Sequence, residues 1–244
     1  MRLRVLSPPD WSISRSLGKW ARKLRIPLSG PAPVKGVIII GNGTPDDIVC
    51  LLLCHKFDGK QVVGVTKPEA AGIKSAILAA LKIVEKVKVK DFMIILDQEE
   101  RGQGEFWNEV EEGFRKEKVE FTVNEEGEGF RAAYECSQAH YKFKVAVLVN
   151  GLPNKQYKKH TIEDHLLELS MSLENVREDV EEVLRESEYD PKEAWKKLRE
   201  KHKEIHEKVY SHLLNASKDK IRSYFPQHVR VLEIFREIIE RREK

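Results

Sequence analysis

Hydrophobic residues in this chain follow two patterns that alternate along the sequence. Short runs that are apolar throughout are typical of strands buried on both faces of a parallel sheet, and the longer stretches between them have the spacing of amphipathic helices. The patterns predict strands at 35–41, 61–65, 91–97, 119–123 and 143–149, and helices at 45–57, 68–86, 105–116 and 127–140. The 119–123 strand is expected at an edge because its residues alternate between apolar and polar. This order predicts an α/β fold with a mostly parallel sheet flanked by helices.

Beyond residue 160 the pattern changes to helices alone. Thr161 is a candidate N-cap with Asp164 three positions later, so a helix is expected from residue 162. Further helical spacing covers 172–187, 191–214, 218–225 and 227–241. We therefore expect an N-terminal extension at 1–35, an α/β domain at 36–160 and an α-helical C-terminal region at 161–244. The charged C-terminal helices suit either the surface of a homo-oligomer or a solvated cap.

The first 35 residues are strongly basic, with eight Lys or Arg residues and one acid, whereas the whole chain has a net charge of only +3. Trp11 and Trp20 lie among these bases. Aromatic side chains between basic ones suit nucleic acid or an anionic membrane surface. The candidates for nucleic-acid binding are Arg15, Lys19, Arg22, Lys23 and Arg25. The alternative is a flexible extension that packs its tryptophans on the rest of the protein.

Cysteine content and hydropathy indicate the cellular setting. The three cysteines, Cys50, Cys54 and Cys136, form no CxxC pair, so buried free thiols and a reducing cytoplasm are expected. No apolar run approaches the length of about 20 residues that crosses a membrane, and the first residues lack the apolar core of a signal peptide. The excess of Lys and Glu over Asn and Gln resembles thermophilic proteins.

Acidic residues follow the most hydrophobic strand directly. Asp97 and Glu99 come at the end of the 91–97 strand, and the carboxyl end of a strand in a parallel sheet borders the ligand crevice. Two carboxylates there could hold a hard cation such as Mg2+. The alternative is a polar loop in a protein rich in Glu.

A glycine-containing loop joins the first predicted strand to the first helix of the α/β domain. Residues Asn42, Gly43 and Thr44 lie just before a helix N-terminus, where backbone N–H groups can bind phosphate. The loop lacks the Gly-Lys-Ser/Thr ending of a Walker loop and the third glycine of a dinucleotide fingerprint. A tight turn that requires glycine is the alternative.

The order of these motifs resembles that of the Toprim domain, over about residues 36–170. Asn42-Gly43-x-x-Asp46 stands where that family has Glu-Gly-x-x-Asp, and Asp97-Gln98-Glu99 stands where it has Asp-x-Asp. The strand and turn at 147–153 and the Glu163-Asp164 pair in a helix resemble an uncharacterised Toprim-like family related to the overcoming-lysogenisation-defect nucleases. The resemblance implies Mg2+-dependent phosphodiester chemistry on nucleic acid.

The resemblance also implies roles for particular residues. Asp97, Glu99, Asp46 and Glu163 would hold Mg2+, with Asp164 as an additional candidate; the acids at 163 and 164 could instead serve only the helix N-terminus. The family's general acid or base is a Glu, and this chain has Asn42 there. An amide cannot exchange a proton near neutral pH. Two functions therefore compete: a Mg2+-dependent nucleic-acid-processing enzyme, and a non-catalytic protein that binds nucleic acid or nucleotides with the same fold.

One further pair of residues suggests metal chemistry. His202 and His206 are four positions apart in the predicted 191–214 helix, which would place both imidazoles on one face and could bind zinc. Their neighbours are Lys, Glu and Arg, and the HExxH spacing is absent, so the alternative is a solvated helix face.

Overall fold

The protein contains one mixed sheet, most of whose strands are parallel. The computed structural model describes residues 1–6, 11–57, 61–87, 89–152 and 155–241, and the sheet order in this part of the chain is β1-β3-β2-β4-β8-β7-β5, with β6 paired to β7. The first five strands in this order are parallel, and β7 pairs antiparallel with β8, β5 and β6. The strands are β1 (Arg2–Val5), β2 (Val37–Ile40), β3 (Val62–Thr66), β4 (Asp91–Asp97), β5 (Glu120–Thr122), β6 (Glu125–Gly127), β7 (Phe130–Gln138) and β8 (Tyr141–Asn150).

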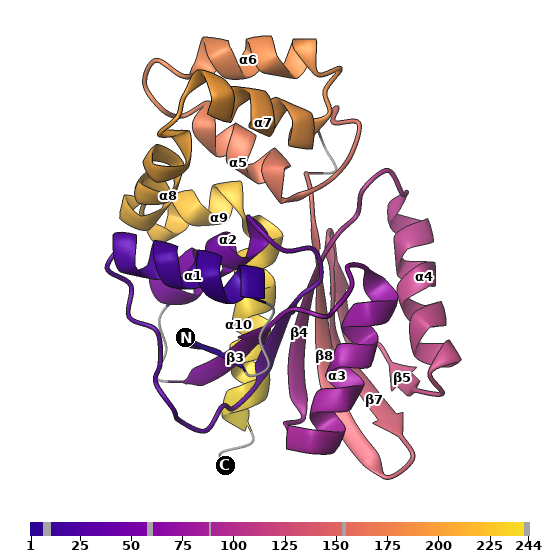
Figure 1. Cartoon of the computed structure of the whole chain (residues 1–244). Helices are drawn as coiled ribbons and strands as arrows, with labels where there is room; N and C mark the ends of the chain where they lie inside the picture. The colour runs from indigo at the N-terminus through magenta and orange to yellow at the C-terminus, as the bar shows by residue number, and fades with distance from the viewer. Residues whose placement is uncertain (7–10, 58–60, 88, 153–154, 242–244) are drawn as a thin grey trace.

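Helices cover both faces of the sheet, which explains why its central strands are apolar throughout. Figure 1 shows α1, α2 and α10 on one side and α3 and α4 on the other. Ile38 and Ile40 of β2 belong to the hydrophobic cluster on the first side, and Val37 and Ile39 to the cluster on the second. The helices named here are α1 (Trp11–Lys23), α2 (Asp46–Lys56), α3 (Ile73–Val87), α4 (Gln103–Lys116) and α10 (Pro226–Glu240).

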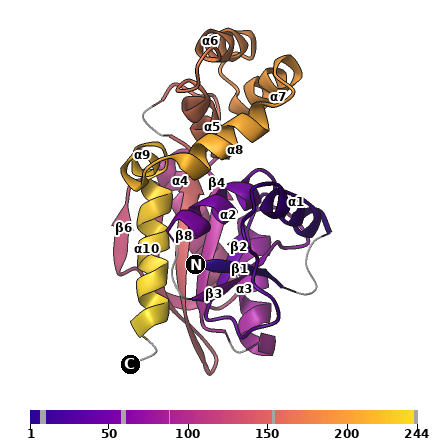
Figure 2. The same ribbon diagram turned by 90° about the vertical axis from the view of Figure 1, so that its left-hand side faces the viewer.

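The remaining helices lie above the carboxyl ends of the parallel strands. Figure 1 shows α5, α6 and α7 stacked over that edge, and Figure 2 shows α10 running along the length of the sheet below them. The five are α5 (Ile162–Ser170), α6 (Arg177–Glu186), α7 (Pro191–Lys201), α8 (Ile205–Asn215) and α9 (Lys218–Tyr224). From Ile162 onward, helices are the only regular elements in the described residues.

The described segments of the first 35 residues are part of the α/β body, which corrects the expected extension. β1 pairs in parallel with β3, with Leu3 opposite Val63. Leu3 and Leu17 are 1% and 0% exposed, and they share a hydrophobic cluster with β2, α2 and α10. The expected boundaries at 35 and 160 therefore do not separate independent cores. β1 escapes recognition because it is a short edge strand in which only one apolar residue, between two arginines, is fully buried.

Three helix predictions need correction. The predicted 127–140 helix is wrong, because this segment contains β7 and the end of β6. The predicted 191–214 helix is interrupted: α7 ends at Lys201, His202 is its C-cap, and α8 begins at Ile205. His202 and His206 are therefore not on one helix face. α2 begins at Asp46, after Pro45 and not with it, and no side-chain hydrogen bond caps it.

Other expectations agree with the structure. The 119–123 segment contains β5, which lies at the edge of the sheet. Cys50, Cys54 and Cys136 are buried free thiols. Within the described residues, no helix has both the length and the apolar character needed to cross a membrane.

The position of β1 makes a prediction about stability. Leu3→Ala removes buried methyl groups between the sheet and α2, so the free energy of unfolding should fall by roughly 2–5 kcal/mol, measured by urea denaturation. The matched control is Arg2→Ala, because Arg2 is exposed in the same strand, and it should change stability by less than about 0.5 kcal/mol. Equal, small effects of both substitutions would mean that β1 is not part of the core.

Candidate functional site

The candidate site lies where the chain changes from one face of the sheet to the other. β2 and β4 are parallel neighbours, with Ile40 opposite Ile95. The loop after β2 leads to α2 on one face, and the loop after β4 leads to α4 on the opposite face. The two loops therefore diverge at the carboxyl ends of the strands, the switch point at which open α/β sheets form their ligand-binding crevice.

Three buried carboxylates from separate elements meet at this crevice. Asp97 ends β4, Asp46 begins α2, and Glu163 lies in the first turn of α5. They are 5%, 4% and 8% exposed. The negative charges of Asp97 and Glu163 both act on Asp46, so the three groups form one electrostatic cluster. We call Asp46, Asp97 and Glu163 the acidic cluster.

Asn150 joins two members of the acidic cluster. It ends β8 directly opposite Asp97 in the parallel register. Its amide nitrogen donates to Asp97 Oδ1 at 2.8 Å and also to Asp46 Oδ1. One amide thus holds the two carboxylates close together at the edge of the sheet.

His228 of α10 fixes the orientation of Asn150. His228 Nε2 lies 2.9 Å from Asn150 Oδ1, and because a carbonyl oxygen can only accept, His228 Nε2 carries the proton and donates. Burial, followed by the neighbouring His165, lowers the pKa of His228 well below its usual value, so the imidazole is neutral. The neutral donor turns the amide of Asn150 so that its N–H groups point at the carboxylates.

Burial shifts the pKa values of the acidic cluster upward. The pKa of Asp46 is raised well above its usual value, first by burial and then by Asp97 and Glu163. Burial and the charge of Asp97 raise the pKa of Glu163 to about 7. Burial also raises the pKa of Asp97, although Lys192 and hydrogen bonds from Asn150 and Asn42 oppose the shift. The cluster therefore holds less negative charge at neutral pH than three exposed acids would.

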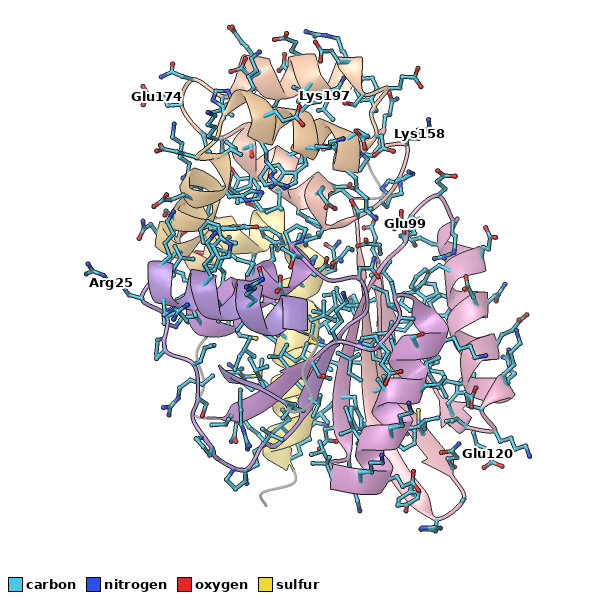
Figure 3. The ribbon with its side chains drawn as sticks, viewed as in Figure 1. Arg25, Glu99, Glu120, Lys158, Glu174 and Lys197 are labelled. Carbon is cyan, nitrogen blue, oxygen red and sulfur yellow. The ribbon has the colours of Figure 1, made fainter. Side chains whose placement is uncertain are left out.

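Lys192 is the cation nearest to the cluster that the structure identifies. This residue, in the first turn of α7, places Nζ 3.4 Å from Asp97 Oδ2 and 2.6 Å from Glu99 Oε1. Partial burial lowers the pKa of Lys192, but the hydrogen bond to Glu99 and the charge of Asp97 outweigh burial and raise it, so Lys192 is charged. Figure 3 shows Glu99 between the end of the sheet and the helices above it.

The Asn42-Gly43-Thr44 loop borders the same crevice. The Asn42 side chain hydrogen bonds to Asp97. Gly43 has φ +128°, which side-chain-bearing residues rarely adopt, and a Cβ at this position would lie 3.4 Å from Lys67 Nζ. The preceding Gly41 packs so closely on β4 that a Cβ would lie 2.8 Å from the Ile95 carbonyl oxygen. The backbone angle at Gly43 and the close packing at Gly41 therefore explain why glycine occupies these two positions. Lys67 adds a cation beside the loop.

Only some of the expected metal ligands lie in the acidic cluster. Asp46, Asp97 and Glu163 form the acidic cluster, whereas Glu99 pairs with Lys192 on its outer side. Asp164 accepts hydrogen bonds from the backbone N–H groups of Thr161 at 3.2 Å and Leu152 at 3.1 Å, so it stabilises the start of α5. In the part of the chain that the structure describes, no group of three or more His, Cys, Asp or Glu side chains has an arrangement suited to a metal ion.

The basic candidates of the N-terminal segment lie on the exposed side of α1 and just after it. Arg15, Lys19, Arg22, Lys23 and Arg25 are all exposed, and Figure 3 shows Arg25 pointing away from the body. Lys23 pairs with Glu207 of α8 at 2.5 Å. Trp20 packs edge-on against Tyr210 at 4.8 Å between ring centroids, as the packing alternative predicts. The side chain of Trp11 and the position of Pro153 are outside the described residues.

A large cavity lies away from the acidic cluster. It has a volume of about 610 Å³ between β1, β3 and α3, and none of the acidic cluster lines it. The part of this cavity closest to the Gly43 loop is formed by Thr66 and Lys67, at the carboxyl end of β3. The chemistry of the crevice therefore belongs to the β2–β4 edge and not to this cavity.

Sequence reasoning missed three residues of the site. Asn150 could have been found, because it ends a buried parallel strand just as Asp97 does. Lys192 and His228 carry no local signal: each lies in a charged or amphipathic helix, and only tertiary packing brings them to the β4–β8 edge.

Comparison with known proteins gives no assignment. No protein-family model, no curated protein and no solved structure matches the chain significantly. The function therefore has to be argued from the site itself.

The raised pKa of Glu163 makes a prediction about pH. Because the folded-state pKa rises from 4.5 to about 7, the folding contribution of Glu163 is fully present below pH 4.5 and is lost as the pH rises through about 7. Glu163→Gln stays neutral, so its stability relative to wild type should increase over this range by up to about 3 kcal/mol. Urea denaturation in EDTA at several pH values measures this difference.

The matched control for this experiment is Glu178→Gln, because Glu178 is exposed in the first turn of α6. Its stability difference from wild type should stay nearly constant with pH. A Glu163→Gln difference that is equally flat would show that Glu163 ionises as an exposed carboxyl does.

Proposed function

We propose that this chain is a Toprim-like protein in which Asp46, Asp97 and Glu163 bind Mg2+ for phosphodiester chemistry on nucleic acid. The observation that carries the proposal is the convergence of three buried carboxylates at the switch point between β2 and β4. The position of Asn42 beside Asp97 supports it further, since the Toprim resemblance requires these two residues at one edge of the sheet.

The donor chemistry of the acidic cluster fits a hard divalent cation. Carboxylate and amide oxygens are the protein ligands that Mg2+ prefers. Glu163 Oε2 is buried and has no hydrogen-bond partner among the described residues, which leaves it free to accept a cation. A bound Mg2+ would neutralise charge that develops at a phosphate. The chain itself contributes Asn150 and His228, which hold two of the acids in place.

Lys192 sets a condition on cation binding. Its ammonium group lies at Asp97 Oδ2, and Asn150 donates to Asp97 Oδ1, so both oxygens of this carboxylate are engaged. A divalent cation at Asp97 therefore has to displace Lys192. We infer that Lys192 and Mg2+ compete for the Asp97 carboxylate. This competition explains why the described side chains are not arranged for a metal ion while Lys192 occupies the position.

A second candidate function is a non-catalytic protein that binds nucleic acid or nucleotides. The observation that favours it is Asn42, whose amide hydrogen bonds to Asp97 where the Toprim family has its general acid or base. An amide at this position can hold Asp97 in place but cannot transfer a proton. Cation binding is common to both functions, and turnover distinguishes them.

Competition between Lys192 and the cation predicts opposite effects of two substitutions. Lys192→Met should tighten Mg2+ binding by about tenfold, because the cation no longer has to displace an ammonium group. Asp97→Asn should weaken binding by at least about tenfold. Isothermal titration with Mg2+ and Mn2+ measures both.

The matched control is Lys196→Met, one turn further along α7 and outside the acidic cluster, which should leave the affinity within about twofold. If Lys192→Met and Lys196→Met change the Mg2+ affinity equally, the change comes from the loss of one positive charge from the protein. Competition between Lys192 and Mg2+ at Asp97 is then excluded.

The choice between the two functions depends on Asn42. With Mg2+ or Mn2+, the non-catalytic function predicts no cleavage of plasmid DNA or RNA by wild type, and Asn42→Glu should introduce cleavage that Asp97→Ala abolishes. The enzyme function predicts cleavage by wild type that Asp97→Ala reduces at least about a hundredfold. Wild-type cleavage that survives Asp97→Ala unchanged would refute the site assignment.

A further inference from the structure

The basic residues of α7 fall into two groups that differ in their partners. The first group faces α6 and is neutralised there. Lys197 Nζ lies 3.3 Å from Glu186 Oε2, and Lys201 Nζ lies 2.7 Å from Glu182 Oε2 and also contacts Asp179. Figure 3 shows Lys197 among these helices. The charges of these two lysines are therefore neutralised by α6.

The second group has fewer acidic partners on other helices within the described residues. Lys192, Lys196 and Arg199 are spaced by four and three residues, which places them on one face of the helix. Lys192 pairs with Asp97 and Glu99. Lys196 pairs only with Glu193 of its own helix at 3.6 Å, with both side chains mostly exposed, and such pairs contribute little. Arg199 forms no ion pair within the described residues.

The basic row of Lys192, Lys196 and Arg199 ends in a surface cavity. The cavity has a volume of about 280 Å³ and is lined by Lys196, Arg199, Glu200, Lys203 and His206. Lys203, like Arg199, has no ion pair in the described part of the chain. With three cations against the one carboxylate of Glu200, the lining carries excess positive charge.

His206 lines this cavity as a buried and neutral aromatic ring. The Nε2 atom of His206 is shielded from solvent and has no hydrogen-bond partner among the described residues. Its ring stacks on Trp195 at 5.2 Å between centroids, so the packing fixes its plane. Burial, followed by the positive charges of Arg199 and Lys19, lowers its pKa to about 4. The imidazole is therefore neutral, and the charge that an anion in the cavity would neutralise comes from Lys196, Arg199 and Lys203.

We propose that this cavity binds a backbone phosphate of a nucleic-acid strand, and that the basic row of α7 guides the strand from the cavity to the acidic cluster. Seven residues of helix separate Lys192 from Arg199, a distance of about 10 Å along the axis. Lys19 of α1 lies close enough to act on His206, so the N-terminal helix adds positive charge at the same end. This inference rests on the proposed function, because it assigns the substrate class and its path to that site.

The test measures binding of the full chain to a fluorescein-labelled single-stranded oligonucleotide, as DNA and as RNA, in EDTA and across a range of salt concentrations. The variant Arg199→Glu/Lys203→Glu should bind at least about tenfold more weakly. The slope of log K against log salt concentration should be shallower by about 1.4, because two phosphate contacts are lost and each contributes about 0.7 to the slope. Arg199→Gln/Lys203→Gln should give a smaller loss in the same direction.

The matched control is Lys74→Glu/Lys86→Glu, which makes the same charge change at two exposed residues of α3. It should alter binding by less than about twofold. Equal losses in the cavity and control variants would overturn the proposal, because they would reflect net charge alone. No binding by wild type, or binding to phosphatidylserine vesicles without binding to oligonucleotide, would overturn it too.

The design separates this inference from the proposed function. Binding in EDTA does not depend on a metal, so it reports on the phosphate site without Mg2+ at the acidic cluster. If cavity variants lose binding while wild type binds no Mg2+, the phosphate site stands and the proposed function fails. If wild type binds Mg2+ at Asp97 but the cavity and control variants bind oligonucleotide equally, the proposed function stands and the phosphate site fails. Equal unfolding midpoints of the variants exclude misfolding.

Discussion

The arrangement of the site depends on keeping carboxylates together in a place from which water is largely excluded. Asp46 and Asp97 repel each other, and burial removes the solvent that would weaken this repulsion. One amide, that of Asn150, donates to both carboxylates, and a neutral histidine behind it prevents the amide from turning. Because Asn150 and Asp97 end adjacent parallel strands, the sheet register itself brings donor and acceptor together.

The sequence predicts the centre of the fold better than its margins. β2, β3, β4 and β8 were recognised because burial on both faces makes them apolar throughout, a property of the local sequence. β1 was not, because it becomes a strand only by pairing with the distant β3. β7 was not either, although it pairs with its neighbours in the chain, β6 and β8. In β7, buried Tyr134 and Cys136 alternate with exposed Glu135. This alternation is too short to predict a strand, because the neighbouring residues are also compatible with a helix.

The same distinction holds for the candidate site. Asp97 could be placed from the sequence by the rule that parallel strands present their carboxyl ends at one edge. Asp46 was suggested by the motif that resembles Toprim. Glu163 was suggested only by resemblance, and Glu99 was expected in the cluster but pairs outward with Lys192. Lys192 and His228 were beyond prediction, because they arrive from helices whose local sequences would suit any solvated surface.

The helices above the sheet do more than exclude water from the crevice. α7 connects two environments of opposite charge: its first turn contributes Lys192 to the acidic cluster, and its far end contributes Arg199 to a cavity with excess positive charge. A change in the position of α7 would therefore alter both environments together. The ion pairs of Lys197 and Lys201 also link α7 to α6 at the surface.

The place of His228 in α10 has a consequence for the order in which the protein can be assembled. During synthesis, β2, β4 and β8 emerge from the ribosome well before residue 228. Until α10 arrives, the amide oxygen of Asn150 lacks the hydrogen bond from His228, and the part of the sheet face that α10 covers is exposed. The nascent chain can therefore form its sheet early, but the binding crevice matures only when the last helix docks.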